Sequence, residues 1–382
     1  MKIVFTGGGT GGHFYPLIAV AEAIEDICKT KHLIEPQLIF MGPEPFDAFA
    51  LDEHNIYYKP SSAGKLNRHS SMRVLNIFGF FATALGIIRA TFQLFTIYPD
   101  VVFSTGGFAS FPTLVAARIL RIPVLMYDAD TSPGRVSMWS SKFARWIAVA
   151  HKDSVAFFPR SAQDKIAQIG HPIRKEILHP AREGGHEFLN LDPSVPTVFI
   201  MGGSQGAKAI NETVLDALGE LITRYNVIHQ AGSANFDEVK GIASVILKNS
   251  RFVDRYRVFG LLNTLALRMS AGVANVIVAR AGSGTIFEVA SWEIPAIFVP
   301  IPLDISRDQT ENAFSYARSG AAEVIEQRNL TPHVLTAEID RIMGDVKLQE
   351  IMKASAREFA RPDAAEKIAK ILLEAGVAHQ PI

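Results

Sequence analysis

The stretch that decides the fold is Gly7-Gly8-Gly9-Thr10-Gly11-Gly12-His13, the first glycine loop of the chain. It follows a short apolar run at residues 3–5, and apolar side chains then recur at helical spacing over residues 17–28. A strand, a glycine-rich turn and a helix in this order direct backbone N–H groups and a helix N-terminus at an anion. A phosphate cradle has no need of an imidazole, whereas proton transfer near neutral pH does. The loop therefore predicts an anion site with a candidate base, His13.

An alternative from another functional class uses the same loop. Gly7, Gly9 and Gly12 fit the G-x-G-x-x-G pattern of dinucleotide-binding folds, although so glycine-dense a run fits many templates. A dinucleotide site needs an acidic residue after the second strand, about 20 residues further on. That strand is predicted at residues 38–41, and the nearest candidate beyond it is Glu44. An NAD(P)-dependent oxidoreductase is kept as this alternative.

Length and composition favour a two-domain protein that does not bind nucleic acid. At 382 residues the chain is long for one core. Lys plus Arg and Asp plus Glu both total 38, so the net charge is zero and no nucleic-acid partner is implied. Cys28 is the single cysteine, which excludes an internal disulfide and suits a reducing cytoplasm. The first residues are expected to form a strand and not a secretory signal.

Strand-like runs alternate with helix-sized segments along the chain, which predicts parallel sheets wound with helices. Residues 179–196 are rich in Pro, Gly and charge and are predicted to link two domains. A strand and the second glycine loop, Gly202-Gly203-Ser204-Gln205-Gly206, then restart the pattern. The predicted fold is α/β, with Rossmann-like parallel-sheet domains at residues 1–178 and 197–360 that face each other across a cleft. Residues 361–382 are predicted to form a helix that packs back on the first domain.

Residue types in the second half suit a sugar nucleotide. The stretch Arg280-Ala281-Gly282-Ser283-Gly284-Thr285 follows a predicted strand and opens a helix whose first N–H groups suit phosphate or sugar oxygens. Glu288 on that helix either holds both ribose hydroxyls or complements the helix dipole. Ser204 either caps its helix or contacts a phosphate. Arg174 suits a diphosphate clamp and Gln309 suits a sugar hydroxyl.

One apolar stretch, residues 74–97, carries Arg89 as its only charge and keeps helical spacing. Its length approaches that of a membrane span, but polar side chains interrupt the apolar surface. Two interpretations stay open: a largely buried or interface helix, or a helix whose face rests in a bilayer. A basic cluster just before it favours the second interpretation and consists of Lys65, Arg68, His69 and Arg73.

Four motifs occur together in a particular order. They are Gly8-Gly9-Thr10-Gly11-Gly12-His13 with Pro16; Thr105-Gly106-Gly107-Phe108 with Ser110 and Pro112; Gly202-Gly203-Ser204-Gln205-Gly206-Ala207; and Arg280-Ala281-Gly282 with Thr285 and Glu288. Gln309 with Asn312-Ala313 extends the set. In this order the chain resembles the MurG family of UDP-N-acetylglucosamine transferases over about residues 1 to 330.

The resemblance implies a GT-B inverting glycosyltransferase that needs neither a metal nor another cofactor. Its donor would be UDP-N-acetylglucosamine and its acceptor the undecaprenyl-diphosphate-linked muramyl pentapeptide. The implied donor residues are Arg174 and Ser204 on the diphosphate, Glu288 on the ribose, Gln309 on the sugar hydroxyls, and Gly282, Ser283 and Thr285 over phosphate and sugar. His13 would be the catalytic base, and the acceptor side would consist of Thr10, Gly11, Gly12, Gly106, Gly107 and Asp130. Backbone groups in residues 263–267 would read the uracil.

The resemblance also implies a peripheral enzyme on the cytoplasmic face of the cell membrane, with residues 65–97 as its membrane-associating face. The chain departs from the family at three places. It has Tyr127-Asp128-Ala129-Asp130 where the family usually reads His-Glu-Gln-Asn, Asp308 for His or Gln, and Phe108 for tyrosine. These departures keep a second alternative open, a related family-28 enzyme that glycosylates another lipid.

Overall fold

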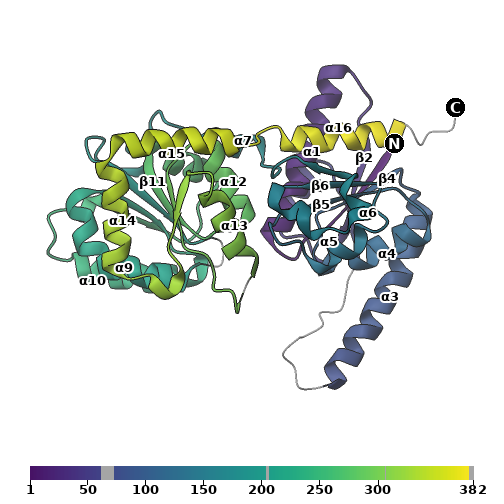
Figure 1. The fold of residues 1–382 in the computed structure, drawn as a ribbon, viewed down its shortest axis with the longest axis horizontal. Coiled ribbons are helices and arrows are strands. Elements are labelled where there is room, and N and C mark those ends of the chain that lie inside the picture. The colour runs from purple at the N-terminus through teal and green to yellow at the C-terminus, as the bar shows by residue number, and fades with distance from the viewer. Residues whose placement is uncertain (62–72, 204–205, 306, 378–382) are drawn as a thin grey trace. The chain divides into compact units, whose positions relative to one another are not determined.

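The computed structural model describes residues 1–61, 73–203, 206–305 and 307–377, and the chain divides into two compact units (Figure 1). Unit 1 comprises Met1–Arg174 and Arg361–Ile382, and unit 2 comprises Lys175–Ala360. Several residues singled out in the sequence lie outside the described residues, namely Lys65, Arg68, His69 and Ser204.

Unit 1 is built on a sheet of seven parallel strands in the order β3-β2-β1-β4-β5-β6-β7. Central strand β1 is buried, and Phe5 in it lies in register with Phe40 and Phe103. A strand that is covered on both faces has a continuous run of apolar residues, and residues 3–5 could therefore be predicted as such a strand. The bounds are β1 Lys2–Thr6, β2 Gln37–Gly42, β3 Tyr57–Pro60, β4 Val101–Ser104, β5 Val124–Asp128, β6 Trp146–Val149 and β7 Ile166–Gln168.

Helices cover this sheet. Helix α16 packs against α1, so the end of the chain returns to unit 1, and a Cβ added at Gly376 would collide with the Met1 side chain (Figure 1). Helix α3 packs on α4. The bounds are α1 Gly11–Lys31, α2 Ala48–Glu53, α3 Arg73–Ile97, α4 Phe111–Ile119, α5 Arg135–Ser140, α6 Arg160–Gln163 and α16 Ala364–Val377.

Unit 2 has a sheet of six parallel strands in the order β10-β9-β8-β11-β12-β13. Its strands are β8 Thr197–Met201, β9 Asn226–Gln230, β10 Tyr256–Phe259, β11 Ala274–Ala279, β12 Ala296–Phe298 and β13 Ala322–Val324. Its helices are α7 Lys175–Leu178, α8 Gly185–Leu189, α9 Lys208–Arg224, α10 Phe236–Leu247, α11 Thr264–Val273, α12 Ser283–Trp292, α13 Arg307–Ala317, α14 Pro332–Gly344 and α15 Val346–Phe359.

The segment predicted as a link, residues 179–196, differs from that prediction because it is packed into unit 2. Helix α8 contacts α11, and the Ala181 N–H donates to the Arg268 carbonyl over 3.0 Å. The Trp292 indole N–H donates to the Ile177 carbonyl over 2.7 Å, which fixes the preceding turn as well. The boundary between the units therefore falls after Arg174, four residues before the predicted end of the first domain at 178.

The strand order reverses once in each sheet, between β1 and β4 in unit 1 and between β8 and β11 in unit 2. In open parallel sheets, ligands bind outside the carboxyl ends of the strands at such a switch point. The first glycine loop follows β1, and the second glycine loop follows β8. Each loop thus lies at the switch point of its own unit.

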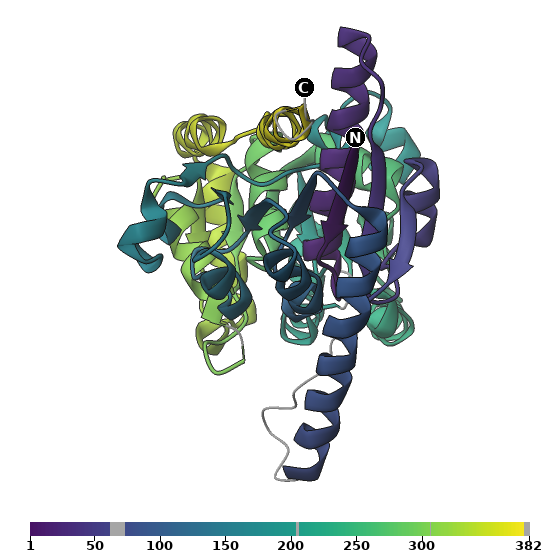
Figure 2. The ribbon, with the colours of Figure 1, turned by 90° about the vertical axis from the view of Figure 1, so that its right-hand side faces the viewer.

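The apolar stretch at residues 74–97 forms α3, which extends past the sheet of unit 1 (Figures 1 and 2). Leu85, Ile88, Phe92 and Phe95 are each about two-thirds exposed, whereas Ala90 and Leu94 are buried. These four exposed side chains, defined here as the α3 stripe, recur every three or four residues and share one helix face. Burial of this face within the chain is therefore contradicted, whereas an interface helix and a helix whose face rests in a bilayer both stay predictions. Within the residues described, the structure contains no helix that is long and apolar enough to cross a bilayer.

Candidate functional site

The first glycine loop turns sharply between β1 and α1. Gly8 and Gly9 have φ angles of 99° and 92°, which favour glycine strongly. Thr10 then precedes α1, which begins at Gly11 with Gly12, so the first N–H groups of the helix face the carboxyl edge of the sheet. The loop therefore has the geometry that a helix N-terminus offers to an anion, and the acceptor role of Thr10, Gly11 and Gly12 stays a prediction.

His13 is held in one orientation by two hydrogen bonds with Thr105. Its Nδ1 lies 2.9 Å from the Thr105 carbonyl oxygen, and the Thr105 hydroxyl donates to the His13 carbonyl over 2.7 Å. Because a carbonyl only accepts, Nδ1 carries the hydrogen, and in the neutral ring Nε2 carries the lone pair. The half-buried ring is thus presented as a base through Nε2.

Gly106 and Gly107 follow β4 and lie beside that ring. Their φ angles are 77° and 75°. A Cβ added at Gly107 would lie 3.4 Å from both Cδ2 and Nε2 of His13, and one added at Gly106 would lie 2.9 Å from the Ser137 hydroxyl. Gly107 thus keeps the space beside His13 Nε2 open, whereas Gly106 makes room for the Ser137 hydroxyl. The exposed Phe108 ring lies next to Gly9 on the same edge.

The stretch Tyr127-Asp128-Ala129-Asp130 ends β5, beside β4. The Asp128 carboxylate accepts N–H hydrogen bonds from Asp130 over 3.1 Å and from Gly134 over 3.3 Å. Burial, and then the charge of Asp130, raise the pKa of Asp128 to about 7, against the opposing effect of a hydrogen bond with Ser137. Asp128 therefore shapes the turn that carries the half-buried Asp130.

His171 is a residue of this edge that the sequence did not identify. The Tyr127 hydroxyl lies 2.8 Å from His171 Nδ1, and both side chains are buried. Burial, followed by the neighbouring His151 and His13, lowers the pKa of His171 to about 3. The only signal in the sequence was its place in Gly170-His171-Pro172, with nothing to connect it to Tyr127, 44 residues away.

Arg174, a predicted donor residue, belongs to unit 1, whereas the other described donor residues belong to unit 2. Its guanidinium carbon lies 4.4 Å from the centroid of the Tyr15 ring on α1. The Tyr15 hydroxyl in turn donates to Asp47 over 3.4 Å. A cation stacked on an aromatic face keeps its N–H groups available at the rim of the guanidinium.

In unit 2, Gly282 precedes α12, and this helix carries Ser283, Thr285 and Glu288 within its first two turns. Arg280, just before it, donates to the carbonyls of Val299 and Pro300 over 2.9 and 3.2 Å. Burial lowers the pKa of the Arg280 guanidinium. These two hydrogen bonds of Arg280 connect the end of β11 to the residues that follow β12. The start of α12 is thereby fixed beside the segment that follows β12.

Gln309 lies on α13, which follows that segment. Its side-chain oxygen accepts from the Ile301 N–H over 3.3 Å, and the neighbouring Thr310 hydroxyl donates to the Ile301 carbonyl over 3.3 Å. The contact with Ile301 orients the amide so that its NH2 group is the part left to donate to a ligand. The structure thus brings Gln309 to the same sheet edge as the residues of α12.

The predicted uracil-reading region is partly occupied by a helix cap. The Asn263 side chain accepts from the Ala266 N–H over 2.8 Å, and the Asn263 carbonyl accepts from the Leu267 N–H over 2.9 Å. These two N–H groups therefore belong to the start of α11. Backbone groups of residues 263–265 remain as the candidates within the predicted range.

Comparisons with known proteins agree with this arrangement. Residues 3–149 match the glycosyltransferase family 28 N-terminal domain, and residues 197–368 match the family 28 C-terminal domain. A Treponema denticola protein named UDP-N-acetylglucosamine–N-acetylmuramyl-(pentapeptide) pyrophosphoryl-undecaprenol N-acetylglucosamine transferase is 33% identical over 93% of each chain. A Bacillus cereus relative with the same name and the number 2 is 31% identical, over 98% of this chain and 99% of its own.

The crystal structure of Acinetobacter baumannii MurG is 25% identical, with a TM-score of 0.73 over 98% of this chain and 99% of its own. The UDP-GlcNAc 2-epimerase of Neisseria meningitidis, 15% identical with a TM-score of 0.64, shares the fold alone over 98% of this chain and 100% of its own. The two family-28 matches, on two Rossmann-like units with a glycine loop at each switch point, identify a GT-B glycosyltransferase of family 28. The chain belongs to the MurG family.

The predicted family, fold class and enzyme class are thus confirmed. The oxidoreductase alternative has no support from these comparisons. The fit of Gly7, Gly9 and Gly12 to a dinucleotide pattern is a coincidence of composition.

Proposed function

We propose that the chain transfers N-acetylglucosamine from UDP-N-acetylglucosamine to the undecaprenyl-diphosphate-linked muramyl pentapeptide, the lipid I to lipid II step of peptidoglycan synthesis. The names of relatives that match nearly the whole chain support this reaction. The observation that carries it is the orientation of His13, because the Thr105 carbonyl engages Nδ1 and leaves Nε2 as a base.

The chemistry follows from that orientation. The acceptor hydroxyl oxygen forms a bond to the anomeric carbon of the donor sugar while the bond from that carbon to the diphosphate breaks. The hydroxyl proton goes to His13 Nε2, a transfer that contributes about 10²- to 10⁴-fold in rate. Attack opposite the leaving group inverts the anomeric configuration. N–H groups at the start of α12 stabilise the charge that develops on the leaving UDP.

On the donor side, Glu288 binds the ribose hydroxyls and Gln309 donates its NH2 group to a sugar hydroxyl. Gly282, Ser283 and Thr285 surround phosphate and sugar, and Arg174 and Ser204 bind the diphosphate. The geometry that supports these roles is the common edge formed by α12 and by the segment that Arg280 and Gln309 hold. Carboxylate and amide groups are well suited to bind hydroxyls, and a guanidinium to bind a diphosphate.

On the acceptor side, the first N–H groups of α1 bind the acceptor diphosphate. Thr10, Gly11 and Gly12 supply these groups, Gly107 keeps the approach to His13 open, and Gly106 belongs to the same acceptor side. Asp130 faces the sugar or peptide of the acceptor. The departure from the family at residues 127–130 lies on this side, so the second candidate is a family-28 enzyme that acts on another glycolipid.

The α3 stripe supports a peripheral position on the cytoplasmic face of the membrane. Four large apolar side chains on one helix face are costly to leave in water, and each buries apolar surface when it enters the interface of a bilayer. Binding there would bring the acceptor's lipid and the first glycine loop to the same surface.

The proposal is tested by transfer of radiolabelled N-acetylglucosamine from its UDP ester to a panel of lipid acceptors. We expect product with the undecaprenyl-diphosphate-linked muramyl pentapeptide and none with a diacylglycerol of equal concentration. Turnover with another glycolipid alone would favour the second candidate. Calorimetry with UDP and with NADPH is the control for the nucleotide class, and binding of NADPH without UDP would contradict the proposal.

A further inference from the structure

A buried chain of hydrogen bonds lies beneath the second glycine loop and is made by Tyr256, His229 and Asn211. We propose that these three are positioning residues, which hold the described ends of this loop, Gly202 and Gly206, in place for binding of the donor's diphosphate. The inference rests on the proposed function, because it assigns to the same donor site the groups that shape it.

The three side chains come from three elements of unit 2 and are almost inaccessible. His229 in β9 is 0% exposed, Asn211 in α9 is 2% exposed and Tyr256, the first residue of β10, is 7% exposed. His229 Nδ1 lies 2.9 Å from the Tyr256 hydroxyl, and His229 Nε2 lies 3.0 Å from Asn211 Oδ1. Asn211 Nδ2 donates to the Ala231 carbonyl over 2.9 Å.

These contacts fix the direction of every hydrogen bond. The Ala231 carbonyl only accepts, so the Asn211 NH2 group faces it and the Asn211 oxygen faces His229. His229 Nε2 therefore carries the hydrogen, and Nδ1 accepts from the Tyr256 hydroxyl. Burial lowers the pKa of His229 to about 4 and raises the pKa of Tyr256, so both side chains stay neutral near pH 7. The hydrogen bonds of Tyr256, His229 and Asn211, called the relay from here on, consequently run in one direction from Tyr256 to the Ala231 carbonyl.

The path ends directly under the loop. A Cβ added at Gly206, whose φ is 77°, would lie only 2.6 Å from the Ala231 oxygen and would also collide with the Asn235 side chain. At the other end of the loop the Gly202 N–H donates to the Gln230 carbonyl over 2.9 Å. Both described ends of the loop therefore rest on residues 230 and 231, so a shift of Ala231 is transmitted to the loop.

If these three residues had a purely structural role, their substitution would lower the stability of the chain and leave the affinity for the donor unchanged. Removal of the Tyr256 hydroxyl leaves the His229 Nδ1 lone pair buried without its donor, which lowers the free energy of unfolding. The ring is then free to exchange tautomers, which puts a lone pair against the Asn211 oxygen and weakens the hold on Ala231. Binding of the donor's diphosphate should therefore weaken, and the free energy of unfolding should fall as well.

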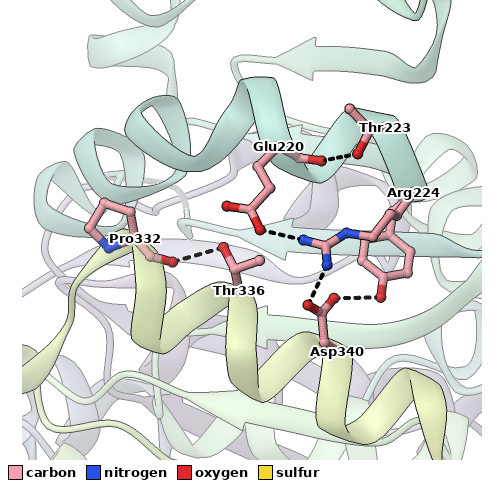
Figure 3. Close-up of polar contacts among 7 residues, drawn as sticks. Glu220, Thr223, Arg224, Pro332, Thr336 and Asp340 are labelled. Carbon is pink, nitrogen blue, oxygen red and sulfur yellow. Dashed lines mark hydrogen bonds and ion pairs between the residues drawn. The ribbon is translucent and has the colours of Figure 1, made fainter.

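The matched control is Tyr225, which is also 7% exposed in the same unit. Its hydroxyl donates to Asp340 on α14 over 2.7 Å, and Arg224 donates to the same carboxylate over 2.6 Å (Figure 3). Tyr225 precedes β9, at the amino edge of the sheet and away from the second glycine loop. Tyr225→Phe therefore removes a hydrogen-bonded hydroxyl from an equally buried residue without changing Tyr256, His229 or Asn211.

The experiment compares Tyr256→Phe with Tyr225→Phe in the full chain, by steady-state transfer, UDP calorimetry and thermal unfolding. For Tyr256→Phe we expect the KM for UDP-N-acetylglucosamine and the Kd for UDP to rise about tenfold, equivalent to about 1.4 kcal/mol. The KM for the lipid acceptor should stay unchanged. Tyr225→Phe should lower the Tm while both KM values remain those of the wild type.

A second variant, Asn211→Ala, breaks the same path at its other end and should also raise the donor KM. Because the path is single, the double variant with Tyr256→Phe should raise it no further than Asn211→Ala alone. Equal donor KM values for Tyr256→Phe and the wild type, or equal changes in Tyr256→Phe and Tyr225→Phe, would overturn the inference. A wild-type chain that does not bind UDP would instead contradict the proposed function.

Discussion

Addition of one methyl group beside His13 tests the proposed base most directly. Gly107→Ala places a Cβ 3.4 Å from Cδ2 and Nε2 of His13, beside the atom that the proposed mechanism uses as the base. A hydroxyl gives up its proton at about 2.6–3.2 Å from the base, so the methyl group and the hydroxyl compete for the same space. The geometry predicts a defect in the chemical step.

The same substitution carries a backbone cost that has to be separated from this effect. At a φ of 75° and a ψ of 161°, Gly107 lies in a backbone region that is essentially restricted to glycine, and an L-residue there costs about 1–3 kcal/mol. Gly184 is a control for the positive φ alone, because its φ is 72° with a ψ of -3° and an added Cβ there would find nothing within 4 Å. Gly184→Ala should therefore destabilise the chain less than Gly107→Ala, and it leaves the base untouched.

The assay is steady-state transfer with both substrates varied, together with thermal unfolding of the two variants. We expect Gly107→Ala to lower kcat by about 10²-fold or more, because proton transfer to a positioned base contributes about 10²- to 10⁴-fold. Gly184→Ala should keep the wild-type kcat. A folded Gly107→Ala enzyme that keeps the wild-type kcat would refute the assignment of the base to Nε2 of His13.

Three further predictions use other parts of the structure. His13→Gln should lower kcat by about 10²- to 10⁴-fold while calorimetry finds the wild-type Kd for UDP, since the donor groups lie elsewhere. The pKa of Asp128 is raised to about 7 from an unfolded value of about 3.9, so its contribution to the free energy of unfolding is greatest below about pH 4 and is lost as pH rises to about 7. Asp128→Asn should flatten that fall in denaturant titrations, and an unchanged pH profile would contradict a buried carboxylic acid. Ile88→Asn combined with Phe92→Asn should weaken sedimentation with anionic vesicles severalfold and leave the Kd for UDP unchanged; undiminished sedimentation would exclude the α3 stripe as the membrane contact.

The elements that could be predicted from the sequence are those whose signal is local. Central strands such as β1 and β8 are buried on both faces and appear as short apolar runs before a glycine loop. Strands β3, β7 and β10 were not predicted, and each lies at an edge of its sheet. An edge strand has one side without a partner strand and tolerates exposed polar side chains, as all four exposed residues of β3 illustrate.

Among the residues of the candidate site, too, those with a local signal could be predicted from the sequence and those that depend on tertiary packing could not. His13 and the residues at the start of α12 could be predicted because glycine loops place them within a few positions of a strand end. The relay could not, because the partners of His229 lie 18 and 27 residues away and meet only when β9, β10 and α9 pack. The position of residues 179–196 in unit 2 also depends on tertiary packing, since α8 is only five residues long and rests on α11.

The structure shows what the side chains of residues 127–130, where the chain departs from the family, contact. Tyr127 directs its hydroxyl to buried His171, and Asp128 uses its carboxylate on the N–H groups of the turn before α5. Asp130 is thus the polar side chain of this stretch that is not fully buried. A carboxylate repels a diphosphate but accepts hydrogen bonds from hydroxyl and amide groups. This chemistry supports the proposal that the acceptor diphosphate binds at the N–H groups of the first glycine loop and that Asp130 contacts the sugar or peptide.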